Sequence, residues 1–475
     1  MTRFVPPVAV ALALLCTTPT EAQETLPPHD ALRAPLHPLT SRDLARLEPL
    51  MALGVAGIVE HDMPPLLPAI HYAVRIDAPA ETVAEIVATP EGFPELLPAV
   101  NEVRIEERRG NSVAYHWQWQ TSVFSLGGRA MLTNYAPPAA QRERGWRVVV
   151  ERTEGDLGHG REVWRIRPTD DGGTVLALST RMDLADANYV TRQMPSSGRS
   201  LSRSITMTTA LAMMLRVQAE AERRAGRPPR VLDPELRRPA IDVRPLEPML
   251  LHADIVLIEA AGEQFRQSAV ITRYPRREAQ VRSVMGDPVA FSEALIQGST
   301  ATVTGQPAPR TVAFDWRYDM PLVGASGSMV MREREDRVLE LDATEGSMRG
   351  GRWRFETSRL PSGATAVLGW AHFDVAEGNF VLRAICDADP TFHVGLGAST
   401  EIMMARAVRI RIDRIPEAED HVPTWRVPEA PATPETATAS TPPTRGRPPV
   451  LLRSAILRRT TPLRARLRRS RGRTR

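Results

Sequence analysis

The chain has 475 residues, of which 60 are basic and 56 acidic, giving a formal net charge of +4 at pH 7. Every basic residue is Arg, and twelve of them lie in residues 445–475, where there is no acidic residue. Without these twelve charges the rest of the chain would carry about −8, so the basic balance describes a C-terminal tail and excludes a uniformly basic nucleic-acid-binding body.

Residues 1–22 have the pattern of an export signal. Arg3 supplies a positive charge, residues 4–16 are an apolar core, and Thr20–Ala22 offer small residues before a cut at Gln23. We therefore expect an exported protein, periplasmic or extracellular, with an uncleaved membrane anchor as the alternative. Cleavage would leave Cys386 as the last cysteine, which excludes an intrachain disulfide and a thiolate zinc cluster.

The sequence then repeats itself. Residues 47–50 (LEPL) return as 246–249 (LEPM), and residues 183–192 return as 374–383. A period of about 200 residues is too long for a solenoid repeat and indicates a duplicated domain. The expected organisation is a signal peptide (1–22), domain 1 (43–224), a Pro-bearing linker (225–245), domain 2 (246–415) and a tail (416–475) that is rich in Pro, Ala and Thr, then in Arg, and expected to be disordered.

In the first copy the apolar pattern is mostly that of strands. Alternation and turn residues predict, in order, a strand (70–77), two short helices (81–89 and 96–98), six strands (100–107, 112–122, 128–135, 146–152, 160–167 and 174–184) and a long amphipathic helix (200–224). The second copy repeats this order, from a strand at 265–273 and a helix starting at 276 to a long helix that ends at 412.

This order resembles the START-like (SRPBCC) superfamily, and within it the coenzyme Q-binding and polyketide-cyclase-like group. The resemblance is carried by Val74-x-Ile76-x-Ala78-Pro79-x-x-x-Val83, by Pro90-Glu91-x-Phe93-Pro94-x-x-Leu97-Pro98, and by Gly172-Gly173-Thr174 before a strand. In the second copy Tyr274-Pro275 replaces Ala-Pro. The resemblance implies an α+β protein of two tandem helix-grip domains, each a curved antiparallel sheet wrapped around a long C-terminal helix, with an apolar cavity between sheet and helix.

Aromatic residues recur on one strand face in both copies. Tyr115, Trp117 and Trp119 alternate in the first copy, and Phe314, Trp316 and Tyr318 repeat the pattern in the second. These side chains could form a cavity wall for a flat apolar ligand, or the ordinary core beneath the helix, and the core interpretation is favoured for most of them.

A Thr-Glu-Gly…Gly-Arg pattern also recurs, and it predicts a Glu154–Arg161 pair and a Glu345–Arg352 pair across neighbouring strands. Such a pair is ordinarily a rim ion pair of small net energy. If it faced the cavity, Arg161 or Arg352 could hold the polar head of a ligand.

No catalytic motif, metal-ligand spacing or cofactor fingerprint is found in the sequence, so we expect no catalytic residue, metal or cofactor. The resemblance favours an exported binding protein for a hydrophobic small molecule, a lipid or an isoprenoid quinone. The alternatives are a cyclase- or aromatase-like enzyme that uses the same cavity, and a duplicated scaffold that binds only proteins. The Arg-rich tail is a candidate for contact with an anionic membrane surface, whereas nucleic acid is not expected as a partner.

Overall fold

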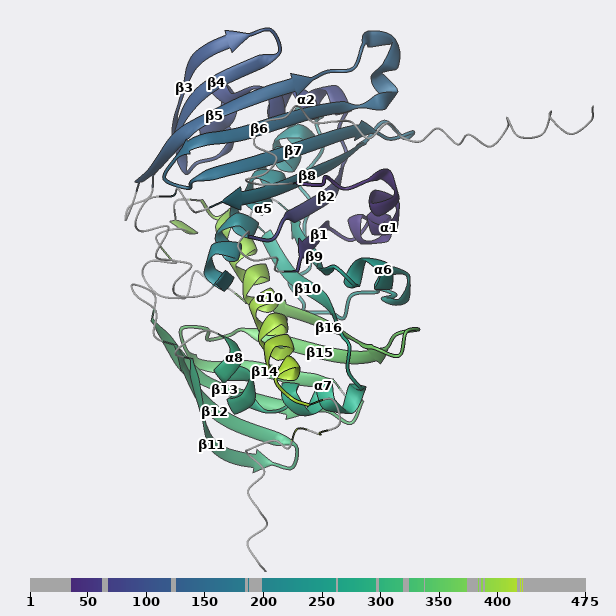
Figure 1. Ribbon diagram of the computed structural model, residues 1–475, viewed down its shortest axis with the longest axis vertical. Helices are drawn as coiled ribbons and strands as arrows, with labels where there is room; N and C mark the ends of the chain where they lie inside the picture. Colours follow the sequence, from purple (N-terminus) through teal and green to yellow (C-terminus); the bar gives the residue numbers. More distant parts are fainter. Residues whose placement is uncertain are drawn as a thin grey trace, which may run out of the picture. The chain divides into compact units, whose positions relative to one another are not determined.

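The computed structural model describes residues 36–61, 67–120, 125–183, 187, 199–261, 264–295, 299–318, 324–336, 338–373, 383, 386–387, 389–416, 419 and 421 (Figure 1). The expected signal peptide, the Arg-rich tail and most of the 183–192 and 374–383 repeat lie outside these residues.

The first copy contributes eight strands and a long helix. Its strands are β1 (Val55–Glu60), β2 (Ile70–Ile76), β3 (Val100–Arg109), β4 (Ser112–Gln120), β5 (Ser125–Tyr135), β6 (Trp146–Gly155), β7 (His159–Pro168) and β8 (Thr174–Asp183). Its helices are α1 (Ser41–Met51), α2 (Ala80–Ala88), α3 (Phe93–Leu96) and α5 (Arg199–Arg224), with 3-10 turns η1 (Pro90–Gly92) and η2 (Ala139–Arg144). All seven strands and two of the three helices that the sequence predicts between residues 70 and 224 are found close to the expected bounds, whereas the short helix predicted at 96–98 lies earlier, at Phe93–Leu96.

The second copy repeats these elements. Its strands are β9 (Ala253–Ala261), β10 (Gln264–Tyr274), β11 (Thr300–Ala308), β12 (Thr311–Tyr318), β13 (Ala325–Glu333), β14 (Leu339–Gly346), β15 (Arg352–Arg359) and β16 (Thr365–His372). Its helices are α6 (Glu247–Leu250), α7 (Glu278–Met285), α8 (Pro288–Leu295) and α10 (Thr391–Asp413), after the 3-10 turn η3 (Arg244–Leu246).

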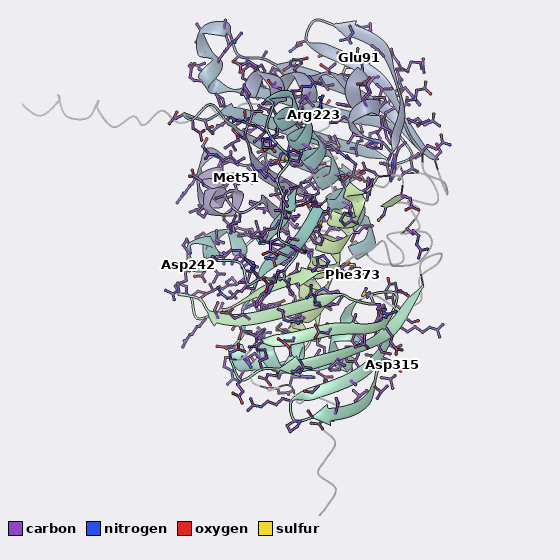
Figure 2. All side chains as sticks on the ribbon, turned by 180° about the vertical axis from the view of Figure 1, so that it is seen from behind. Met51, Glu91, Arg223, Asp242, Asp315 and Phe373 are labelled. Carbon is purple, nitrogen blue, oxygen red and sulfur yellow. The ribbon has the colours of Figure 1, made fainter. Side chains whose placement is uncertain are left out.

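Both copies have the same strand order. The order is β1-β2-β8-β7-β6-β5-β4-β3 in the first and β9-β10-β16-β15-β14-β13-β12-β11 in the second, and every paired neighbour is antiparallel. This internal identity of topology confirms the duplication and the α+β helix-grip architecture. Figure 2 shows the side chains of both copies, with Glu91 and Arg223 labelled in the first and Asp315 and Phe373 in the second.

One sheet of 16 strands runs through both copies, because β1 pairs with β9 over six residues from Val55↔Ile258 to Glu60↔Ala253 (Figure 1). Neither of these two strands is predicted from the sequence. Five of the six β1 residues are buried, on both strand faces, so the alternation that identifies a half-buried strand is missing. One face packs on α1 and α6, and the other faces the core beneath α5.

Each long helix is held against its sheet by a buried tyrosine on the strand beside the joint. Tyr72 of β2 donates a hydrogen bond to the Met207 carbonyl of α5 at 3.3 Å. Tyr274 of β10 donates to the Ala405 carbonyl of α10 at 2.7 Å. Because a buried phenol must satisfy its hydroxyl, these bonds fix the position of each helix over its sheet.

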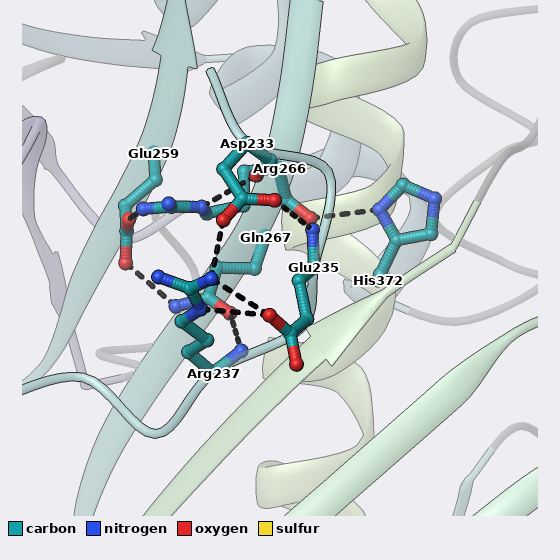
Figure 3. Close-up of polar contacts among 7 residues, drawn as sticks. All are labelled: Asp233, Glu235, Arg237, Glu259, Arg266, Gln267 and His372. Carbon is teal, nitrogen blue, oxygen red and sulfur yellow. Dashed lines mark hydrogen bonds and ion pairs between the residues drawn. The ribbon is translucent and has the colours of Figure 1, made fainter.

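The linker between the copies is fastened to the second copy (Figure 3). The Arg237 backbone N–H donates to Gln267 Oε1 at 2.9 Å, and Arg266 donates to the Asp233 carbonyl at 2.7 Å. Glu259 completes this contact by accepting from Arg266 and Gln267. None of the described helices is both long enough and apolar enough to cross a membrane.

Candidate functional site

The first copy contains an apolar cavity between its sheet and α5. The cavity volume is about 110 Å³, measured as the space that the centre of a water molecule can occupy. All empty space within the cavity and its open mouth amounts to about 1010 Å³. Its walls come from the turn after α2 (Phe93, Leu96 and Leu97), from β4 (Tyr115, Trp117 and Trp119), from β6 and β7 (Val150, Arg152, Glu162 and Trp164), and from α5 (Thr209, Ala212, Met213 and Val217).

The aromatic residues predicted on β4 form one wall of this cavity. Alternation places Tyr115, Trp117 and Trp119 on its inner face, and the Phe93 ring meets the Tyr115 ring edge-on at 6.3 Å. The Trp117 indole N–H is buried and has no hydrogen-bond partner among the described residues. A ligand oxygen near Trp117 would therefore find a donor that no protein group occupies.

A polar corner, formed by Tyr115, Arg152 and Glu162, interrupts the apolar wall. Arg152 and Glu162 form an ion pair, and their side chains are only 12% and 5% exposed. Burial, assisted by the Glu162 carboxylate, raises the pKa of Tyr115 above its ordinary value, so its hydroxyl stays protonated. The polar corner thus offers hydrogen bonds to a ligand without adding net charge to the cavity.

Arg161, which the sequence offered as the ligand-orienting residue, does not line the cavity. It is buried on the opposite face of β7, where its Nη2 lies 3.0 Å from Glu151 Oε1. The predicted Glu154–Arg161 pair is wrong, since Glu154 instead faces Arg129 at 3.0 Å. Cross-strand register decides this, because Arg161 is directly opposite Glu151.

Arg152 and Glu162 were missed, although one feature of the sequence points to Glu162. Trp164 and Ile166 are large apolar residues at alternate positions of β7, and Glu162 lies on the same face of the strand. A strand whose core-facing residues continue into a charged one is the pattern of a buried polar group. In β6 three consecutive valines (Val148–Val150) interrupt the alternation of apolar and polar residues. The sequence therefore does not show which face of the strand Arg152 occupies.

The pocket described in the second copy, against α10, is smaller than the cavity of the first. The pocket against α10 offers about 20 Å³ to the centres of water-sized molecules. Three methionines on its wall (Met285, Met331 and Met404) occupy the volume, as flexible thioethers do in irregular cores. Phe314, Trp316 and Tyr318 pack in a core cluster instead of lining this pocket, with the Trp316 and Tyr318 rings stacked at 5.6 Å.

Arg352 does not line the pocket of the second copy either. It is exposed at the start of β15 and lies opposite Asp342 in the strand register. No ion pair joins it to Glu345 within the described ranges, so the predicted Glu345–Arg352 pair is also wrong.

One acidic side chain in this pocket stands out. Glu401 of α10 is 1% exposed, and its Oε2 accepts a hydrogen bond from the Ser268 hydroxyl at 2.7 Å. Its Oε1 has no hydrogen-bond partner of good geometry in the part of the chain that is described, and it lies over Gly369, where a Cβ would come within 3.1 Å. Burial raises the pKa of Glu401 to about 8, against the opposing effect of Ser268.

Neither cavity has the ligand set of a metal centre. Over the described ranges, no group of three or more His, Cys, Asp and Glu side chains comes close enough to hold an ion. The chemistry that the first cavity offers is therefore apolar burial, with hydrogen bonding at the polar corner and at Trp117.

Residues 68–196 match the family described as polyketide cyclase/dehydrase and lipid transport. No curated protein matches the chain. Among solved structures, the chain is similar to the Zhui aromatase/cyclase of Streptomyces sp. R1128, with 19% identity over 33% of this chain and 94% of that one (TM-score 0.28). It is also similar to the STAR-related lipid transfer protein of Xanthomonas axonopodis, with 12% identity over 40% and 99% of the two chains (TM-score 0.29).

A di-domain protein is similar over a longer span. The ARO/CYC protein StfQ of the steffimycin biosynthetic pathway matches with 12% identity over 72% of this chain and 98% of that one (TM-score 0.25). The family match thus lies within the first copy, and the second copy repeats the strand order of the first.

Proposed function

We propose that the protein binds a hydrophobic small molecule in the cavity of its first copy. The observation that carries this proposal is the contrast between the two described pockets: the volume is about 110 Å³ in the first copy and about 20 Å³ against α10 in the second. In this proposal the second copy serves mainly as a scaffold.

The size of the first cavity favours a ligand that inserts one ring or a few methylene groups. A cavity of about 150 Å³ lined by apolar side chains holds one benzene ring. The head of an isoprenoid quinone has one ring and two carbonyl oxygens, which the polar corner and the Trp117 N–H could bind. Burying about 200 Å² of apolar surface would contribute on the order of 5 kcal/mol before the losses of association.

The acidic groups support binding over the enzymatic alternative. In the roomy cavity the Glu162 carboxylate is held in an ion pair with Arg152. The carboxyl whose pKa suits proton transfer, Glu401, lies in the pocket that has space for little more than a water molecule. Among the described residues that line the first cavity, the two carboxylates, Glu162 and Asp389, are both held in ion pairs with arginines.

The binding site can be tested with duroquinone, a fully substituted benzoquinone that does not add to thiols and quenches indole fluorescence. We expect saturable quenching of the full chain, because three cavity residues are tryptophans. Ala130→Phe fills the cavity and should abolish saturation, whereas Ala114→Phe, on the next strand and outside the cavity wall, should not. Equal titrations of all three proteins would refute the proposal.

The acyl chain of a lipid is an alternative ligand, because it would fill the same apolar cavity. Displacement of duroquinone by 1-decanol, with no displacement by short-chain quinols, would assign the cavity to acyl chains. Native mass spectrometry of protein purified from the periplasm identifies the natural occupant, and a clean ligand-free mass would count against binding.

We also propose that the protein works outside the cytoplasm, with its tail near an anionic membrane surface. The signal-like residues 1–22 and the twelve Arg of residues 445–475 support this placement. Fractionation of cells should recover the chain without residues 1–22 outside the cytoplasm. Deleting residues 445–475 should remove salt-sensitive binding to phosphatidylglycerol vesicles.

A further inference from the structure

Two residues of the second copy line the cavity of the first. Asp389, just before α10, and Phe392, in its first turn, complete the wall that β4 and α5 build. The Phe392 ring stacks on the Trp119 ring, with 5.4 Å between centroids and 14° between planes. The aromatic wall predicted from β4 thus continues into a residue of the other copy.

Asp389 fixes this arrangement. Its carboxylate is 1% exposed and lies 2.9 Å from Arg216 of α5. The same oxygen accepts hydrogen bonds from the backbone N–H and hydroxyl of Thr391, at 3.0 and 2.7 Å. A buried carboxylate held by these partners orients the first turn of α10 relative to α5.

The two helices approach closely just beyond this point. A Cβ at Gly395 of α10 would lie 2.7 Å from the Thr208 Cα of α5. Ala212, Cys386 and Phe392 form a buried cluster here, with Trp119 and Leu396 packed against it. The start of α10 is therefore docked by packing, by an ion pair and by a backbone approach that glycine permits.

We propose that the first cavity is a composite site in which the second copy supplies a specificity-determining residue, Phe392. This inference rests on the proposed function and adds to it. A flat ring inserted beside Trp119 meets the Phe392 edge of the wall, so a ligand contacts both copies. By linkage, a ligand that touches both copies stabilises the docked arrangement of α10 on α5, and docking in turn raises affinity.

Photolabelling tests this composite site in the unaltered full chain. Adamantane diazirine, a small neutral hydrocarbon, should enter the cavity and on illumination label peptides from β4 and from residues 389–396. Excess duroquinone should suppress both labels. Labelling of β4 alone, with residues 389–396 unmodified, would overturn the proposal.

Paired variants measure the contribution of Phe392. Phe392→Ala should raise the duroquinone concentration for half-quenching about tenfold, the loss of one good aromatic contact. Leu396→Ala removes a side chain of the same helix that packs in the same cluster without lining the cavity, and it should change this concentration less than about twofold.

Phe392→Leu keeps apolar volume and serves if the Ala variant does not fold; it should give an intermediate change. Equal effects of the Phe392 and Leu396 variants would reduce Phe392 to a packing residue and overturn the proposal. If Ala130→Phe leaves quenching unchanged, the proposed function fails. If Ala130→Phe abolishes quenching and Phe392→Ala has no effect, only the composite site fails.

Discussion

At the scale of single residues, the interior of this protein holds charge in two different ways. In the first cavity Arg152 and Glu162 neutralise each other as a pair. In the second pocket Glu401 has no basic side chain among the causes of its pKa shift, and burial keeps it protonated. A lone buried carboxyl of this kind makes stability depend on pH.

The sign of this dependence follows from the two pKa values of Glu401. In the unfolded chain the pKa is near 4.5 and in the folded chain about 8. Between these values the folded state binds a proton that the unfolded state has released, so the free energy of unfolding falls as pH rises through this window. The stabilising contribution is fully present below pH 4.5 and is lost by about pH 8.

Glu401→Gln should remove this loss, because an amide does not titrate. Urea unfolding at pH 5 and pH 8 should show a decrease for the natural protein that exceeds the decrease for the variant by a few kcal/mol, about 1.4 kcal/mol for each pKa unit. Glu345→Gln, at an exposed position of β14, serves as the control and should retain the decrease. Parallel pH profiles of all three proteins would contradict the assignment.

At the scale of elements, the crossing of α5 and α10 is the contact that the sequence pattern does not reveal. Gly395 and Gly397 lie two residues apart on α10 and meet different neighbours. At Gly395 an added Cβ would strike the Thr208 backbone at 2.7 Å, whereas at Gly397 the nearest atoms are the Phe265 ring edge at 3.2 Å and the Phe373 carbonyl oxygen at 3.3 Å. A side chain can yield by a few tenths of an ångström, but a helix backbone cannot without moving the helix.

Gly395→Ala should therefore destabilise the protein by about 1–3 kcal/mol, the cost of overpacking, although alanine is the better helix former. Gly397→Ala is the matched control and should cost less. Chemical denaturation of both variants measures the difference. A stability gain of about 1 kcal/mol in Gly395→Ala, the value that helix propensity alone predicts, would show that the helices are not in close contact.

At the scale of the whole described fold, the joint between the copies is built from backbone pairing and buried charge. Asp254 of β9 is fully buried, and it lies 2.8 Å from Arg409 and 3.3 Å from Arg406 of α10. Arg406 also donates to the Glu60 carbonyl at the end of β1, at 2.8 Å. Burial acts to raise the pKa of Asp254, but Arg409, His61 and Arg406 together hold this pKa well below its ordinary value.

Asp254→Asn should cost about 3–5 kcal/mol, because it removes the buried carboxylate charge that pairs with Arg406 and Arg409. Hydrogen exchange measured by mass spectrometry should show faster exchange in strands of both copies, since the joint belongs to both. Glu235→Gln, which breaks an exposed pair of the linker, should cost less than about 1 kcal/mol. Faster exchange confined to the second copy would show that the copies unfold separately.

The sequence by itself determined the features that repeat at short, regular intervals along the chain. Strands that are buried on one face alternate, so β2 to β8 and the aromatic face of Tyr115, Trp117 and Trp119 were predictable. The duplication was predictable as well, because two copies of one fold preserve short matching segments such as residues 47–50 and 246–249. These features depend on neighbours within a few residues.

Only the tertiary structure decided which face of a strand certain residues occupy and which residues far apart in the chain pack together. β1 and β9 join the copies yet show no alternation, because both of their faces are covered. Strand register determines that Arg152 and not Arg161 lines the cavity. The three consecutive valines of β6 do not allow this register to be read from the sequence. The cavity wall includes Asp389, which is held by Arg216, 173 residues away in the chain, and no local pattern encodes a contact of that span.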